Sequence, residues 1–516
     1  MEKVSDFIKR YAQTVTEAYL FFMIVIFPFY APQGYVEIGT HKFLFFKVAS
    51  LMCFGMLLPA VVFQLVCIKR KGWIKLSITD ICLLLYGAAV LVSFVCTEWK
   101  QDALWGAEGW YMGAASQLLF VAVYFVVSRF IENVKVWYVI GTGISAAVFL
   151  LGLLNRFSVY PLQMEGANPG FISTLGNINW FCSYWVVLFP VGLVAYWNGW
   201  GNNNRIKKAT LIGYMLLGFM TGIAQGSSSG FLALGGLGFA MFILSFKNSE
   251  KILRWLELVI LFSVSALLLS ILKNRFPVYF NYQNAVGDIL TQYKTGVFLF
   301  AVSVICYAML HFGIRQKKLR GTGLFVIRNA VMVVTALTVL CICLLTVYYS
   351  SHPNSMENSQ MAEKFVIDSD WGNGRGTTWY AGIESFASMP LVRKLIGIGP
   401  DCFYRYVYED SEIAAKLYEV FGDARLTNAH NEWLTILVNT GIFGLVAYVA
   451  TFISSIGRQL KGGRKNEIML IGAVCQIAYT IHNMVSFQQV ICTPLIFIIM
   501  GLGERLLHSE NSIKIE

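Results

Sequence analysis

The sequence predicts an all-α polytopic membrane protein with about 14 transmembrane helices (roughly 12–14) and a large extracytoplasmic loop that contains amphipathic helices. Only 13% of the 516 residues are charged and 57% are hydrophobic, whereas about 25% of the residues of a soluble protein are charged. The mean hydropathy is +0.61. The apolar residues form continuous runs rather than an alternating pattern, which favours membrane helices over the strands of a barrel.

Apolar runs long enough to cross a bilayer recur along the whole chain. They lie at 18–34, 43–68, 78–97, 113–131, 136–154, 179–197, 209–225, 230–246, 252–272, 295–313, 327–349, 429–454, 467–486 and 490–507. No small-residue cleavage site follows the charged N-terminus, so we expect the first run to be a retained anchor. The predicted parts are N-terminal transmembrane helices (1–169), a central transmembrane bundle (170–349), the extracytoplasmic loop (350–428) and C-terminal transmembrane helices (429–516).

The formal net charge of +11 comes from short basic clusters between the apolar runs. Membrane topology explains these clusters, so we predict no nucleic-acid partner. Lys69–Lys71, Arg315–Arg320 and Arg458–Lys465 all fall on one side of the predicted bundle. Because basic connections stay in the cytoplasm, this pattern predicts that both termini are cytoplasmic. We therefore expect a multi-pass protein of the cytoplasmic (inner) membrane.

With this orientation the long polar connections, 98–112, 155–178, 273–294 and 350–428, all face outward. The last is rich in aromatic residues, and a loop of that length is functional more often than passive. Two apolar stripes at helical spacing predict amphipathic helices within it. The stripes are Trp379, Ile383 and Phe386, and Ile413, Ala414, Leu417, Val420 and Phe421.

Eleven cysteines lie almost entirely inside apolar runs, where Cys acts as a small hydrophobic residue. Their spacing predicts neither a disulfide framework nor a metal site.

His430 is the strongest candidate for chemistry. It lies where the polar loop enters an apolar helix, between Asn428 and Asn431. A neutral imidazole, with an ordinary pKa of about 6.5, can accept a proton from a hydroxyl nucleophile. A helix-capping role is the alternative. Gly441 and Gly444 follow at helical spacing and predict close packing that would fix the helix carrying His430.

Arg375 is the second candidate, and it lies between Gly374 and Gly376. Flanking glycines let the backbone approach an anion closely. A guanidinium is permanently charged and binds phosphate oxygens in bidentate geometry. A surface arginine paired with Asp368 or Asp370 explains the pattern equally well.

Three further polar sets have both a functional and a structural interpretation. Asn177 and Asn179 could contact a sugar or cap a helix. Ser227–Gly230 predicts a tight turn between two helices. His482–Asn483, inside a predicted span, is a functional-site hypothesis, but hydrogen bonding between helices explains it equally well.

These motifs resemble the O-antigen ligase and polymerase superfamily of bacterial membrane glycosyltransferases. The resemblance covers residues 170–505. Its pattern is Arg375-x-x-x-Trp379, Pro390, Gly397-x-Gly399-x-x-x-Phe403, His430-Asn431 with Gly441-x-x-Gly444, and Gly176-Asn177-x-Asn179 with Pro190.

The resemblance implies transfer of a glycan from a polyprenyl-pyrophosphate carrier, such as undecaprenyl pyrophosphate, at the outer face of the cytoplasmic membrane. The implied acceptor is a glycan, lipid or protein hydroxyl, and the implied reaction needs no metal, nucleotide sugar or other cofactor. His430 would be the base that activates the acceptor, and Arg375 would bind the pyrophosphate. The implied substrate-binding residues are Asn431, Trp379, Gly399, Arg393, Arg405, Arg425, Asn177 and Asn179.

The chain also departs from that family. Ser229 and Trp110 stand where relatives often carry arginine, which would weaken a cationic donor site unless another arginine substitutes. The candidate substitutes are Arg156, Arg275, Arg393, Arg405 and Arg425. Fourteen spans exceed the number usual in the family. A lipid-linked oligosaccharide flippase or other transporter is therefore the alternative function, and a non-catalytic assembly partner is a third.

Overall fold

The computed structural model describes residues 2–67, 76–281, 284–316, 322–352, 366–369 and 371–513. This part of the chain is helical apart from one short antiparallel pair, β1 (Phe171–Ile172) with β2 (Gly176–Asn177). The first helices are α1 (Glu2–Phe21), η1 (Phe22–Ile26), η2 (Phe27–Phe29), α2 (Ile38–Cys67), α3 (Ile78–Cys96), α4 (Lys100–Trp105), α5 (Ala114–Phe130) and α6 (Val134–Arg156). The central helices are α7 (Ile178–Trp197), α8 (Arg205–Ala224), α9 (Ser228–Ser245), α10 (Ser249–Arg275), α11 (Ala285–Leu290), α12 (Tyr293–Arg315) and α13 (Thr322–Ser351). The last are α14 (Trp371–Ser388), α15 (Leu391–Ile396), α16 (Phe403–Val407), α17 (Ser411–Phe421), α18 (Glu432–Gly462), α19 (Met469–His482) and α20 (Thr493–Ile513).

The predicted all-helical membrane architecture is confirmed, but the predicted count of fourteen spans is not. Within the described ranges, eleven helices are long and apolar enough to cross a membrane. Every predicted apolar run falls on a helix, yet α5 and α19 have only 17 and 14 residues, and α20 carries Glu504 and Arg505 and is not among the eleven. The hydropathy of the sequence predicted α5, α19 and α20 as spans because it does not show where a helix ends. The chain leaves α19 at His482 and runs as a non-helical segment to Cys492.

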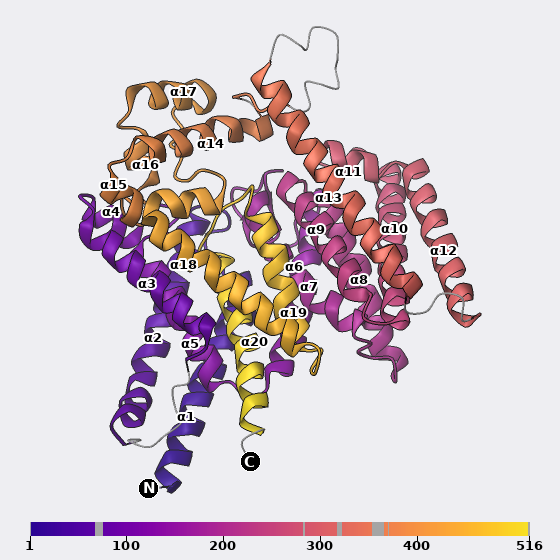
Figure 1. Cartoon of the computed structure of the whole chain (residues 1–516), viewed down its shortest axis with the longest axis horizontal. Helices are drawn as coiled ribbons and strands as arrows, with labels where there is room; N and C mark the ends of the chain where they lie inside the picture. The colour runs from indigo at the N-terminus through magenta and orange to yellow at the C-terminus, as the bar shows by residue number, and fades with distance from the viewer. Residues whose placement is uncertain are drawn as a thin grey trace.

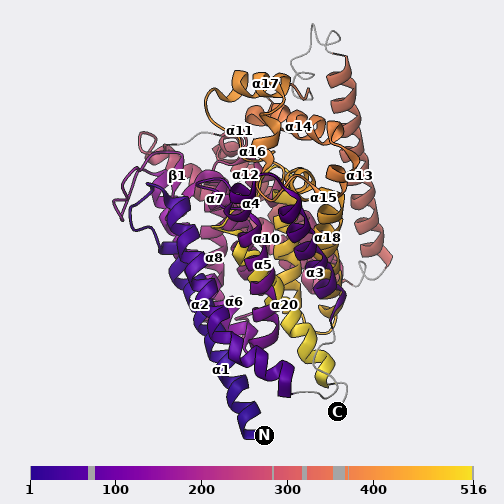
Figure 2. The ribbon, with the colours of Figure 1, turned by 90° about the vertical axis from the view of Figure 1, so that its left-hand side faces the viewer.

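Both termini lie at one end of the bundle, and α14, α16 and α17 lie at the opposite end (Figures 1 and 2). We call these the terminal end and the loop end. The arrangement fits the prediction that the termini share one side and that the 350–428 connection projects from the other. Which end faces the cytoplasm stays a prediction.

The centre of the bundle is α7, which contacts α6, α8, α9 and α19. Of its most apolar stretch 83% is buried, compared with 6% for α12 and none for α13. Helix α12 lies at the edge of the bundle in Figure 1, and α13 lies at the edge in Figure 2. A helix that is apolar all round is buried in protein or faces lipid. The core therefore forms around α7, and α12 and α13 present their apolar surfaces to the bilayer.

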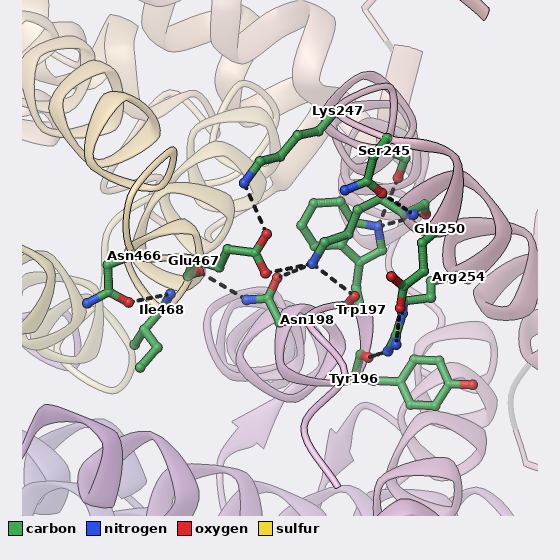
Figure 3. A network of polar contacts seen from close by, with 12 residues as sticks. Tyr196, Trp197, Asn198, Ser245, Lys247, Glu250, Arg254, Asn466, Glu467 and Ile468 are labelled. Atoms are coloured by element: carbon green, nitrogen blue, oxygen red, sulfur yellow. Dashed lines mark hydrogen bonds and ion pairs between the residues drawn. The ribbon is translucent and has the colours of Figure 1, made fainter. Parts of the chain in front are cut away.

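Two polar clusters join the helices at the terminal end. In the first, the Lys251 Nζ donates to Asn198 Oδ1 (3.0 Å) and lies 2.7 Å from Glu467 Oε2, while Lys247 lies 3.0 Å from Glu467 Oε1. Figure 3 shows Lys247, Asn198 and Glu467 converging from three parts of the chain. This cluster ties α7 and the start of α10 to the connection between α18 and α19.

In the second cluster, Asp80 and Glu504 have side chains with no exposed area. Asp80 lies 2.6 Å from Arg129, and Glu504 lies 2.6 Å from Arg458 and 3.2 Å from His508. Asp80, Glu504 and His508 are close enough together to hold a metal ion. Because each carboxylate already faces a guanidinium, we assign the cluster to joining α3, α5, α18 and α20.

The 350–428 connection contains α14–α17, and one of its two predicted stripes is correct. On α17, Ile413 and Leu417 are buried as predicted. On α14, the predicted stripe is correct only in part: Phe386 packs against the buried cluster of the loop and Trp379 is half-buried, but Ile383 is 58% exposed, and the most buried residues are Thr378 and Ala381. The reason is that α14 packs against the start of α18 through its small residues, which hydropathy spacing does not favour.

Candidate active site

The start of α18 presents His430. Asn431 is the N-cap, and its Oδ1 accepts a hydrogen bond from the Leu434 amide (3.0 Å). His430 precedes the cap with a φ of 49°, a left-handed conformation uncommon for a non-glycine residue. Its amide donates to Asn428 Oδ1 (2.9 Å). The two asparagines therefore hold His430 in a turn outside the helix, so the capping role belongs to Asn431 and not to His430.

The His430 side chain is neutral and has a free ring nitrogen. Its Nδ1 is buried and has no hydrogen-bond partner in the described part of the chain. Its ring meets the edge of Phe487 with the centroids 5.1 Å apart. Burial, and then the positive charge of Arg375, lower the pKa of His430 to about 4. A neutral imidazole with a buried acceptor nitrogen can take a proton from a bound hydroxyl group.

Arg375 approaches this histidine from α14. The helix begins with left-handed backbone at Gly372, Asn373 and Gly374, so the chain turns sharply before the arginine. Arg375 Nη1 donates to the Gly372 carbonyl (2.6 Å), and Nε donates to the Val485 carbonyl (3.0 Å). Burial lowers its pKa from the ordinary value.

The sequence left open whether Arg375 pairs with a nearby aspartate. Among the residues described, Arg375 forms no ion pair, and its hydrogen bonds go to main-chain carbonyls. Asp370 lies outside the described residues, and Asp368 is not a partner. The guanidinium therefore keeps its charge unmatched by any described carboxylate, which is the arrangement expected of an anion-binding arginine.

Two contacts bring the distant segments together. The buried Thr378, one helical turn after Arg375, donates its hydroxyl to the Ala429 carbonyl next to His430 (2.9 Å). The non-helical segment after α19 supplies both the Val485 carbonyl for Arg375 and the Phe487 ring for His430. The site is thus assembled from α14, the start of α18 and the α19–α20 connection.

A small cavity of about 30 Å³ is lined by Asn428 and Glu432, which lie on either side of His430 in the chain, and by Phe487, which contacts the His430 ring. A cavity of this size has room for about two water molecules. Its polar lining includes Asp401, Asn428, Glu432, Asn439 and Gln488, and its apolar lining includes Trp110 and Phe487. The buried Asn439 Oδ1 has no partner in the parts that the structure describes.

Asp401 is a site residue that the sequence reasoning missed. Its buried carboxylate accepts hydrogen bonds from the Ala107 amide (2.8 Å) and the Met112 amide (3.1 Å), and so holds the connection that carries Trp110. Burial raises its pKa to about 7. The sequence feature that could have identified it is its position directly after Gly397-x-Gly399-Pro400.

The two glycine motifs dock onto each other. Gly441 interrupts α18 with a φ of 70°. The carbonyls of Val438 and Asn439 accept the amides of Ile398 (3.2 Å) and Gly399 (3.0 Å). A side chain at Gly441 would collide with the backbone of Leu395. The predicted role of Gly441 in helix packing is therefore corrected to a break that receives a backbone loop. Gly399 occupies that loop, beside Thr97.

The other predicted arginines have different surroundings. Arg393 lies 3.0 Å from Glu98, and Arg405 lies 2.7 Å from Asp102, so both are neutralised by acids near α4. Arg425 is exposed. Arg156 is buried and donates to the carbonyls of Pro169, Ala224 and Gln225.

Trp379 and Trp110 belong to the aromatic surroundings of the site. Trp379 stacks at a tilt on Trp371, with centroids 5.3 Å apart, and its buried Nε1 has no partner among the described residues. Trp110 meets Phe487 edge-on (5.0 Å) and Trp180 edge-on (5.7 Å). Trp110 thus fills the place for which an arginine was expected with aromatic packing around the cavity.

Asn177 and Asn179 lie at the start of α7. Asn177 caps the helix by accepting the Asn179 amide (2.8 Å), and Asn179 Oδ1 accepts the Ser227 hydroxyl (2.8 Å). Ser229 is buried and contacts His482. Among the described residues, neither Asn177 nor Asn179 forms a hydrogen bond with Arg375 or His430. Buried polar side chains, described below, connect Asn179 to the start of α18.

A comparison with protein-family models assigns part of this chain. Residues 284–449 match the family model described as O-antigen ligase. The protein carries an O-antigen ligase domain. The resemblance found in the sequence is thereby confirmed over residues 284–449, in a protein whose described residues include eleven helices long and apolar enough to cross a membrane. No curated protein matches the chain.

The O-antigen ligase domain extends from α11 into α18 and contains both Arg375 and His430. It also contains Asp401, Asn431 and the two docked glycine motifs. The α19–α20 connection, Asn177 and Asn179 lie outside the matched range. The family assignment suggests transfer of a glycan from a lipid carrier, and it makes lipid-linked glycans and the membrane the expected partners.

Proposed function

We propose that the protein transfers a glycan from an undecaprenyl-pyrophosphate carrier to an acceptor hydroxyl at the outer face of the cytoplasmic membrane, as a ligase or a polymerase of surface polysaccharide. One observation carries the proposal. Arg375, which no described carboxylate neutralises, and His430 both contact the short segment after α19, at the Val485 carbonyl and the Phe487 ring, although 54 residues separate them in the chain. This pair fits an anionic leaving group on one side and a hydroxyl nucleophile on the other.

In the proposed reaction, His430 accepts the proton of the acceptor hydroxyl as its oxygen attacks the anomeric carbon. The new glycosidic bond forms while the bond from that carbon to the pyrophosphate oxygen breaks. The polyprenyl pyrophosphate leaves with the bonding electron pair, and Arg375 stabilises its charge. We assign this counter-charge to Arg375 rather than to a metal ion, because the guanidinium matches phosphate oxygens in geometry and charge.

The electrostatics of the pair support an ordered use of the two substrates. Without donor, burial and, after it, the Arg375 charge keep the pKa of His430 low. An anionic pyrophosphate beside Arg375 would offset that charge, which is the smaller of the two causes, so the pKa of His430 would rise while burial still holds it below its ordinary value of about 6.5. His430 would then be a stronger base and still neutral at pH 7. We propose that Asn431, Trp379, Gly399, Asn177 and Asn179 line the path of the glycan, with the exposed Arg425 at its outer end.

Reconstituted protein supplied with a lipid-linked oligosaccharide tests the proposal. The wild-type protein should lengthen the lipid-linked glycan (polymerase) or move it to another acceptor (ligase). His430→Ala should lower the rate by about 10²–10⁴-fold, the contribution of a general base, while the protein still folds and inserts. His311→Ala, on the peripheral α12, is the matched control and should keep the wild-type rate.

Two results would contradict the proposal. Wild-type transfer by His430→Ala would exclude this histidine as the base. Movement of a labelled lipid-linked glycan across the liposome, without any change in its covalent structure, would identify a transporter instead.

A further inference from the structure

A chain of polar side chains runs from the start of α18 to the start of α7. Its members, in order of contact, are Glu432, Asn483, His482, Ser229, Ser227 and Asn179. We propose that this polar chain holds the catalytic base in position, and that Glu432 and His482 are its positioning residues. The inference deepens the proposed function and rests on the proposed role of His430.

The first end of the polar chain surrounds Glu432, whose side chain is buried at the beginning of α18. Its carboxylate accepts the hydroxyls of Tyr448 (2.5 Å) and Tyr479 (2.9 Å) and the side-chain amide of Asn483. The Glu432 main-chain amide also donates to the Asn483 carbonyl (3.0 Å). Asn483 therefore binds Glu432 through both its side chain and its backbone.

The polar chain continues through His482, which is fully buried. Its Nδ1 lies 2.6 Å from Asn483 Oδ1, and its Nε2 lies 3.1 Å from Ser229 Oγ. Ser229 Oγ lies 2.6 Å from Ser227 Oγ, whose hydroxyl donates to Asn179 Oδ1 (2.8 Å). Helices α18, α19, α9 and α7 are thus joined by one unbroken set of hydrogen bonds.

The direction of these hydrogen bonds follows from donor counting. Ser227 has one proton and gives it to Asn179, so Ser229 must donate to Ser227, and His482 Nε2–H must donate to Ser229. With Asn483 as oriented, His482 Nδ1 also carries a proton, and the imidazolium is balanced by the Glu432 carboxylate. If the Asn483 amide turns over, its NH₂ group faces His482 Nδ1 and its oxygen faces Glu432. His482 Nδ1 is then an acceptor, and Glu432 must be protonated to donate to the Asn483 oxygen.

In both arrangements Glu432 and His482 together carry no net charge. A lone buried carboxylate would be costly, whereas a pair with no net charge and with every hydrogen bond made costs less. Two protonation patterns thus satisfy the same heavy-atom positions. This explains how a glutamate and a histidine can both be buried between apolar helices, and it predicts that an amide in place of the Glu432 carboxyl is tolerated.

The polar chain is placed so that it controls the site. Glu432 lies two residues after His430, and Asn483 lies two residues before Val485, whose carbonyl receives Arg375. Phe487, which contacts the His430 ring, follows in the same segment. Releasing Glu432 from Asn483 would therefore loosen His430 and its two neighbours together. Misplacement of a reacting group by about 1 Å can lower a rate about 10²-fold.

The test measures kcat and KM of reconstituted variants. Glu432→Ala should lower kcat by about 10–100-fold with a smaller change in KM. Glu432→Gln should keep kcat within about threefold, because the new amide can donate to a turned Asn483 and to Tyr479. Ser229→Ala should lower kcat by about 2–10-fold, the worth of one hydrogen bond. The double variant Glu432→Ala, Ser229→Ala should fall no further than Glu432→Ala alone.

Glu504→Ala is the matched control, since it removes another buried glutamate at the terminal end and should leave kcat of the folded protein unchanged. Any of three results would overturn the inference. Glu432→Ala could keep wild-type kcat, or Glu432→Gln could lose as much kcat as Glu432→Ala. In the double variant, the reductions in kcat caused by Glu432→Ala and Ser229→Ala could multiply. If Glu432→Ala does not fold, Ser229→Ala decides, and wild-type kcat in it would overturn the inference. Should His430→Ala keep its activity, the proposed function fails, which is a result separate from all of these.

Discussion

At the terminal end of the bundle, buried acids face bases. Asp80 lies 2.6 Å from Arg129, and Glu504 lies 2.6 Å from Arg458. At the loop end, by contrast, Arg375 and His430 have no acidic partner among the residues described: the hydrogen bonds of Arg375 go to main-chain carbonyls, and the buried Nδ1 of His430 forms none. The charged groups at the terminal end have partners of opposite charge within the fold. Arg375 and His430, at the loop end, would gain their partners only when a substrate binds.

This difference separates two uses of polar groups in an apolar protein. A fold that needs only stability pairs its buried charges, because an unmatched one is costly. An unmatched group persists where a ligand completes it, and functional sites are where local rules of folding are broken. The comparison therefore makes opposite predictions for the two ends. Substitutions at the terminal end should lower stability and leave the transfer rate unchanged, whereas substitutions at the loop end should lower the transfer rate and leave stability nearly unchanged.

The largest effect is expected from breaking a matched pair. Glu504→Ala leaves Arg458 without its acid and should lower stability by about 3 kcal/mol, the low end of the range for a broken buried pair, because Arg458 is 25% exposed. Thermal unfolding in detergent measures the loss. The rate per folded molecule should be unchanged, and a fall in that rate would erase the distinction between the ends.

The next effect concerns the unmatched cation. Arg375→Gln should weaken transfer by about 1.5–3 kcal/mol, the worth of a charged hydrogen bond, with little loss of stability. Arg405→Gln, which breaks an exposed pair with Asp102, is the control and should cost about 0.2–1 kcal/mol in stability with transfer retained.

The same variant has a second readout. Because the Arg375 charge helps to lower the pKa of His430 to about 4, its removal should raise that pKa and shift the acidic limb of kcat/KM to higher pH. An unmoved limb in Arg375→Gln would mean that the two residues do not share a site.

The last effect is a pH dependence from Asp401, which changes stability and not the transfer rate. Burial raises its pKa to about 7, above the value of about 3.8 in an unfolded chain, so the folded protein holds this proton more tightly. Its contribution to stability is complete below pH 3.8 and is lost as the pH rises through 7, by at most about 1.4 kcal/mol per pH unit. Asp401→Asn keeps an acceptor for the Ala107 and Met112 amides. Its stability relative to wild type should therefore improve from pH 5 to pH 8, and parallel unfolding curves at both pH values would refute this.

The two principal site residues could be found from the sequence because each has a local signature. His430 stands between asparagines at the start of an apolar run, and Arg375 stands between glycines in a polar one. Asp401, Glu432 and Phe487 could not be assigned in this way. Their roles come from contacts with distant residues, such as Ala107 for Asp401 (294 positions away) and Asn483 for Glu432 (51 positions away). The prediction for Ile383 on α14 failed for the same reason, since α14 buries Thr378 against Ala429 through a hydrogen bond rather than through hydropathy.

The sequence by itself determined the membrane class, the positions of the helices and the family motifs. These follow from composition and from the hydropathy of consecutive residues, which act over one helix length. Only the tertiary structure decided which helices are short, that Gly441 breaks α18 to receive the Gly397–Gly399 loop, and that Arg375 and His430 contact the same segment after α19. Those features depend on buried polar groups finding partners across the bundle, and the partner that satisfies each group is set by helix packing rather than by its neighbours in the chain.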